Sequence, residues 1–442
     1  MSTNQTQAST FNPRENRLLT ILMGMLLLGF AWQIRGNGTS NPSTVITLFL
    51  LFLSVHYGPR QKFHLVIFAL AVLLFALLRT GWGTFVAQSG IPGLYPGHIV
   101  PDQADITNNN VYDIVVHWWM GYFWLFIVGL AWAGFPSLIF GGYFFTTVKY
   151  TFKHLGIGIV VFLAGRYLAG FIAAQIIPFL APQYYQDLYL TELSLRNYRS
   201  MYGNLSTAMA IIPVLLCIYF WMKDKAFVWR SVVVMSIFGI GLSLASVWQS
   251  IGRNHPEWDL PFWSLWEYFS GFIIGGLLFW FYSRFSEQEL QKTDISPGLE
   301  ALDKWNMAGQ FLVYAAALYF FVLWGLQDSF GGSVSVTSRK LEVDPFVSGG
   351  TIHLAVLAVA LPLYFFYLRG NIGTALYKRS FQEKSLIALL VLLPVNYLNF
   401  LASYIVTGTL SDLNLAGWLD TISFVVVEVY LIYLYRRRFV GI

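Results

Sequence analysis

The 442-residue chain is 56% hydrophobic and only 11% charged, and its formal net charge is +5. Soluble domains carry roughly 25% charged residues, so this composition excludes a chain folded entirely behind a water-facing surface. It predicts an all-α integral membrane protein whose main partner is the lipid bilayer.

The chain begins with a polar segment. Residues 1–17 are rich in Ser, Thr, Asn and Gln, and they lack the charged-then-apolar order of a cleaved signal peptide. We therefore expect a cytoplasmic N-terminal tail, followed by a first apolar run that is retained as a helix.

About twelve apolar stretches follow, each of roughly 15–23 residues, which is close to the length that crosses a bilayer as a helix. The expected spans are 18–34, 43–57, 63–80, 112–133, 155–177, 206–222, 230–251, 262–283, 306–326, 351–368, 385–407 and 415–435.

The distribution of basic residues predicts which ends of the spans face the cytoplasm. If the first span starts inside and the spans alternate, 19 of the 27 Lys and Arg residues fall in inside segments and 7 in outside segments. The terminal run Arg436-Arg437-Arg438 then lies inside as well. We expect a plasma (inner) membrane protein with both termini cytoplasmic, whose basic charge faces anionic lipid and not nucleic acid.

The two halves of the chain resemble each other. The first span ends in Trp32-Gln33 followed by Arg35, and the seventh ends in Trp248-Gln249 followed by Arg253. Other matches follow in the same order, which favours two parallel six-helix repeats, at 18–225 and 226–442. Chance matching among aromatic-rich helices is the alternative.

Six plus six helices with both ends inside resembles the major facilitator superfamily. The loop Tyr57–Lys62 between the second and third spans keeps the glycine and two basic residues of that family's loop motif but lacks its aspartate. The resemblance implies transport by rocking of two halves about a midplane site.

Three ionisable residues lie well inside expected spans, where charges are costly and face a cavity or a partner. Arg166 can grip a carboxylate, sulfate or phosphate with its planar guanidinium, or it can pair with a carboxylate on a neighbouring helix. Glu267 and Glu428 are candidates for proton transfer, as coupling groups or as a catalytic acid or base, and a salt bridge to Arg166 is the alternative. Asn396 occupies the place in the second half that corresponds to Arg166 and is a further candidate solute ligand.

Four further side chains give less specific signals of a function. Asp113 and His117 are spaced i, i+4 and share a helix face, which fits proton transfer or a hydrogen bond at a helix end but supplies too few ligands for a metal site. Asp420, two turns before Glu428, lines the same route or is an ordinary first-turn acid. Trp118 belongs to an aromatic run that can stack on a sugar or form part of the membrane's aromatic belt.

Three arginines lie at the expected outer ends of spans. Arg35, Arg253 and Arg79 either extend toward lipid headgroups or form a positive vestibule for an anion.

The chain contains no Walker, dinucleotide-binding, His-Glu-x-x-His or Cys-x-x-Cys motif, so we expect neither a metal nor a cofactor. The sequence therefore favours a secondary transporter of a small polar, anionic solute, with proton coupling and an anionic or sugar-like ligand. The alternative is a membrane-embedded enzyme that acts at the outer face on a glycan or lipid-linked substrate.

Overall fold

The computed structural model describes residues 17–36, 42–57, 119–145, 152–180, 195–285, 334–336, 339–341, 381–406 and 413–439. The expected spans 63–80, 306–326 and 351–368 lie outside these residues.

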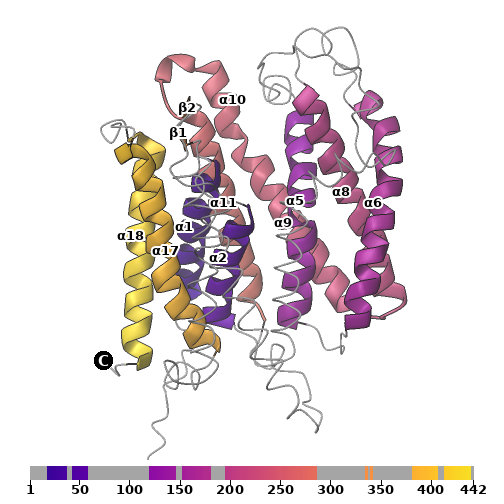
Figure 1. The fold of residues 1–442 in the computed structure, drawn as a ribbon, viewed down its shortest axis with the longest axis horizontal. Helices are drawn as coiled ribbons and strands as arrows, with labels where there is room; N and C mark the ends of the chain where they lie inside the picture. Colours follow the sequence, from indigo (N-terminus) through magenta and orange to yellow (C-terminus); the bar gives the residue numbers. More distant parts are fainter. Residues whose placement is uncertain are drawn as a thin grey trace, which may run out of the picture. The chain divides into compact units, whose positions relative to one another are not determined.

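The described residues are almost entirely helical (Figure 1). The elements are α1 (Arg17–Gly36), α2 (Pro42–Tyr57), α5 (Trp119–Phe145), α6 (Phe152–Leu180), α8 (Leu195–Phe220), α9 (Lys225–Ala245), α10 (Val247–Asn254), the 3-10 turn η3 (Pro256–Trp258), α11 (Phe262–Tyr282), β1 (Val334–Val336), β2 (Arg339–Leu341), α17 (Phe381–Val406) and α18 (Leu415–Phe439).

Six described stretches are long and apolar enough to cross a membrane: 17–34, 156–173, 203–220, 225–252, 262–282 and 415–437. Large apolar side chains on their surfaces are exposed, among them Leu168, Ile212, Ile422 and Val429. Such a surface suits lipid and not water. The chain is a multi-pass helical membrane protein.

The described helices form two compact units. The terminal unit holds α1, α2, most of α11, the β1–β2 hairpin, α17 and α18; the central unit holds α5, α6, α8, α9 and α10. The expected boundary between residues 225 and 226 falls just after the first residue of α9, inside the central unit. The division into two sequential six-helix bundles stays a prediction.

Glycines bring α1 and α11 together in the terminal unit. A Cβ atom on Gly271 would meet the carbonyl oxygen of Leu28, and one on Gly275 would meet that of Gly24. Since Gly271 faces the later residue of α1 and Gly275 the earlier one, the two helices are antiparallel. Small residues four apart allow close backbone contact, which stabilises helix pairs in membranes through van der Waals packing.

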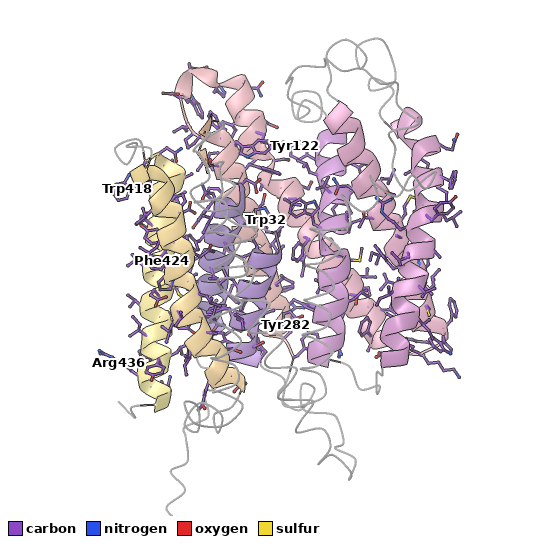
Figure 2. The ribbon with its side chains drawn as sticks, in the orientation of Figure 1. Trp32, Tyr122, Tyr282, Trp418, Phe424 and Arg436 are labelled. Carbon is purple, nitrogen blue, oxygen red and sulfur yellow. The ribbon has the colours of Figure 1, made fainter. Side chains whose placement is uncertain are left out.

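One end of the terminal unit gathers basic residues. At the start of α1, the Nε atom of Arg17 donates a hydrogen bond to Oγ of Ser283, just past the end of α11, at 2.8 Å. Near the end of α2, His56 lies beside Tyr430 of α18, and Arg436 follows farther along α18 (Figure 2). We call this the basic end. It holds the start of α1 and the ends of α2, α11 and α18.

Hydroxyl groups and glycines join α5 to α9 in the central unit. Ser243 Oγ donates to the carbonyl oxygen of Tyr122 at 2.8 Å, and Ser231 Oγ donates to that of Ser137 at 3.2 Å. Between these two contacts, a Cβ atom on Gly129 would lie 2.5 Å from the Cα atom of Gly239. The pairing of early residues of α5 with late residues of α9 makes these helices antiparallel.

Two helices are longer than hydropathy predicts. α8 begins at Leu195, before the expected span 206–222. α5 continues to Phe145, beyond the expected span 112–133. Hydropathy detects only the apolar part of a helix, so the polar first turns of α8 are missed.

Candidate functional site

Four buried polar side chains of the terminal unit lie on α11 and α18. Glu267 and Tyr268 lie on α11, and Asp420 and Ser423 lie on α18. Asp420 is 0% exposed and Glu267 is 3% exposed. The Tyr268 hydroxyl and Ser423 Oγ are 2.7 Å apart and share a hydrogen bond. We call these four residues the acidic cluster.

The periodicity of α18 places Asp420 in the interior. Buried positions recur every three or four residues along this helix, at Ala416, Asp420, Ser423, Val427 and Leu431. This spacing forms one continuous stripe on an α-helix, and the acid and the serine belong to it. The buried face of α18, which packs on the other helices, thus includes the carboxyl group of Asp420.

The carboxyl group of Asp420 is buried without a hydrogen bond. Among the residues that the structure describes, neither of its oxygen atoms has a hydrogen-bond partner. An ionised carboxylate without a partner is costly in an apolar interior, so an acid at such a place is a candidate for proton exchange or cation binding.

α17 closes the cluster from another side. The Tyr397 hydroxyl donates to Oγ1 of Thr421 at 3.0 Å, and its ring stacks on Phe424 with centroids 4.1 Å apart. Asn396, the preceding residue, is buried, and its Nδ2 atom has no hydrogen-bond partner among the described side chains and backbone. The middle of α17 therefore combines a hydrogen-bonded aromatic anchor with an amide whose donor group is unused.

Polar groups continue along α18 toward the basic end. Glu428 lies at the edge of the buried stripe, and its Oε2 atom is buried without a hydrogen-bond partner in the described part of the chain. Beyond it, the Tyr430 hydroxyl lies 3.5 Å from Nε2 of His56, and the two rings are stacked at 16°. The buried polar series thus runs from Asp420 past the middle of α18 to His56 near the end of α2.

Arg166 lies in the central unit, in the middle of α6. Its Nη1 atom donates a hydrogen bond to Oγ of Ser206 on α8. Ser206 is fully buried, and its hydroxyl also donates to the carbonyl oxygen of Gly203 at 3.3 Å. The serine therefore holds the guanidinium group in a fixed orientation at the α6–α8 contact.

The structure brings together part of the set predicted from sequence. Glu267 on α11, Asn396 on α17, and Asp420 and Glu428 on α18 all belong to the terminal unit. Arg166 belongs to the other unit.

The structure describes the backbone positions of only two of the remaining predicted residues. Arg35 is placed near the end of α1 and Arg253 near the end of α10. Arg79, Asp113, His117 and Trp118 lie outside the described residues.

Sequence reasoning missed the hydroxyl groups and the histidine of this series. Ser423 lies three residues after Asp420 on the same helix face, so it could have been found from its spacing, whereas Tyr268 directly follows Glu267 and does not share its face. His56 near the end of α2 and Tyr430 are 374 residues apart, and no local pattern connects them.

The described residues include no group of three or more His, Cys, Asp or Glu side chains that could hold a metal ion. Comparisons with family models, with curated proteins and with solved structures find no match.

Proposed function

We propose that this protein is a proton-coupled secondary transporter of a small polar, anionic solute, in which Asp420 carries the proton. The carboxyl group of Asp420 is the observation that supports this proposal most directly. It is fully buried in a membrane-spanning helix, and no described residue offers it a hydrogen bond. Intramembrane acids of this kind mark proton relays in pumps and transporters.

The extent of the polar series favours transport. An enzyme needs polar residues only at one mouth, whereas a transporter needs them along the whole depth of the membrane. Glu267 and Asp420 lie toward the end of the terminal unit opposite the basic end, Glu428 lies in the middle of α18, and His56 with Tyr430 lies near the basic end. These five side chains support a proton route along α18.

The directions of the helices support the proposed topology. The start of α1 and the end of α18 lie at the same end of the terminal unit, as an even number of membrane crossings requires. We propose twelve spans in two parallel repeats, both termini in the cytoplasm of the inner membrane, and alternating access by rocking of the two halves.

Arg166 is the proposed partner of the solute's negative charge. A serine hydroxyl holds one nitrogen of its guanidinium group, and the planar fork offers five N–H donors in all. A guanidinium oriented in this way suits a carboxylate or phosphate group.

The proposal is tested by proton movement in proteoliposomes that contain a pH-sensitive dye. Succinate, phosphate and gluconate are added outside in turn. We expect at least one of them to acidify the lumen with the unaltered protein, and Asp420→Asn to abolish this response. Asp259→Asn is the matched control, because Asp259 is an exposed acid in the turn before α11. Solute-driven acidification that persists in Asp420→Asn would exclude Asp420 as the carrier.

The same cluster also fits the alternative function. Glu267 and Asp420 lie toward one end of the terminal unit, where an enzyme acting at the outer face on a glycan or lipid-linked substrate would need its acid and base. Under this alternative, cysteines placed beside Asp420 and Glu428 react with an impermeant thiol reagent only from outside. Labelling from both sides, with reciprocal protection, supports transport.

A further inference from the structure

The repeated Trp-Gln pair places a buried amide in each unit. Gln33 lies near the end of α1 in the terminal unit, and Gln249 lies in α10 in the central unit. Their side chains are 1% and 9% exposed. The sequence match between the two helices is thus accompanied by the same burial.

Gln249 follows an interruption in a membrane helix. α9 ends at Ala245, Ser246 forms a turn, and α10 starts at Val247, although the apolar stretch runs on to Gly252. In transporters, interrupted helices form solute sites, because they bring polar groups to membrane depth.

Neither amide atom of Gln249 has a hydrogen-bond partner in the described part of the chain. The next residue of α10, Ser250, has its Oγ atom 3.2 Å from the Tyr122 hydroxyl of α5. Gln249 therefore holds unused hydrogen-bonding capacity in a helix that also forms a polar contact with α5.

Gln33 shares this property at its amide oxygen. Its Oε1 atom is buried without a hydrogen-bond partner among the described residues. Gln33 lies one turn after Gly29, on the same face of α1, and a Cβ atom on Gly29 would lie 3.1 Å from Cζ of Tyr268. This face of α1 is the one that packs on Tyr268.

We propose that Gln33 and Gln249 are solute-binding residues, each within its own unit, that hydrogen-bond the hydroxyl or amide groups of a small polar solute. A glutamine amide both donates and accepts, so it recognises a hydroxylated, sugar-like or sugar-acid solute. Leaving such an amide unpaired in an apolar interior is costly, and this cost recurs at the same motif in both units. The inference names the solute class for the proposed transporter and rests on that function.

Cysteine accessibility tests this inference without knowledge of the solute. In a Cys217→Ala background, Gln33→Cys and Gln249→Cys are labelled with a trimethylammonium methanethiosulfonate reagent. Ser231→Cys is the control, because Ser231 is equally buried but hydrogen-bonded to α5. We expect both test cysteines to react at least about tenfold faster than the control, and gluconate to slow them. Labelling no faster than the control would overturn the proposal.

A second measurement tests the inference if a cysteine variant fails to fold. Gln33→Met and Gln249→Met remove the amide and keep the volume. We expect each to unfold at a higher temperature than the parent without solute and to lose the stabilisation that gluconate gives the parent. A lower unfolding temperature, or an unchanged gluconate effect, would show that the amides are structural. The Asp420→Asn experiment can fail while these labelling and unfolding results hold, so the two proposals are tested separately.

Discussion

The hydroxyl of Tyr268 on α11 lies 2.7 Å from Oγ of Ser423 on α18, one turn from the carboxyl group of Asp420. Both hydroxyls are buried, so this hydrogen bond joins two membrane helices inside the terminal unit. Asp420 follows the same buried stripe of α18 as Ser423, so the acid lies next to the hydrogen bond that joins the two helices.

Tyr268→Phe removes this hydrogen bond while keeping the ring. We expect it to lower the free energy of unfolding by about 0.5–1.5 kcal/mol, the usual range for hydrogen bonds between membrane helices. Ser423→Ala should cost a similar amount, and the double variant little more than either, because both remove the same bond. Unfolding in mixed detergent micelles measures all three. Additive costs would show that the two hydroxyls do not depend on each other.

Gly271→Ala should separate α1 from α11. The added methyl group would meet the carbonyl oxygen of Leu28, which is backbone and cannot rotate away. We expect a loss of about 2–3 kcal/mol in the free energy of unfolding, at the upper end of the cost of overpacking.

Gly156→Ala is the matched control for this variant. Gly156 also lies in a membrane helix, α6, but a Cβ atom there would have no neighbour within 4 Å. Alanine is the better helix former by roughly 1 kcal/mol, so this variant should be neutral or slightly stabilising. Equal losses at both positions would mean that the close approach of α1 and α11 is not what stabilises the unit.

Part of the site could be predicted from sequence, because an ionisable residue is costly in a membrane and is easily recognised among apolar neighbours. Glu267 and Glu428 stand out among apolar neighbours, and the structure buries the first and half-buries the second. Asp420 was a weaker prediction because it falls in the first turns of its helix, where acids are common. Its burial follows from which face of α18 packs inward, and hydropathy carries no information about that face.

The pairing of helices lay beyond sequence reasoning. α1, α2 and α11 pack in one unit with α17 and α18, although more than 300 residues separate the first from the last. The glycines of α11 indicate close packing but do not name the partner helix. The salt bridge between Glu267 or Glu428 and Arg166 stays a prediction, and the structure shows a serine on α8 as one hydrogen-bond partner of Arg166.

Glu257, in the turn between α10 and α11, should titrate below an ordinary glutamate. Its own backbone N–H and, to a smaller extent, His255 Nδ1 at 3.0 Å stabilise the carboxylate and lower its pKa. Because the pKa is lower in the folded turn than in an unfolded chain, the stabilisation is complete above the ordinary glutamate pKa. It is lost as the pH falls through the lowered value.

Carbon NMR of protein labelled at the glutamate carboxyl carbons measures this pKa, and the signal of Glu257 is assigned from its loss in Glu257→Gln. His255→Ala should raise the pKa only part of the way, because the backbone N–H is the larger cause and remains. A full return to the ordinary value would show that the histidine is the main cause.

Tyr430→Phe should slow proton movement at the basic end without unfolding the protein. The Tyr430 hydroxyl lies 3.5 Å from Nε2 of His56, at the long limit of a hydrogen bond, while the rings stack with centroids 5.9 Å apart. Because the ring remains, the free energy of unfolding should change by less than about 1 kcal/mol. Solute-driven acidification in proteoliposomes should fall on the order of fivefold to tenfold, because the hydroxyl is the polar group of α18 that contacts His56 on the proposed route. Tyr433→Phe is the control, since Tyr433 lies on the exposed side of the same helix. Equal rates in the two variants would assign His56 and Tyr430 to packing and end the proton route at Glu428.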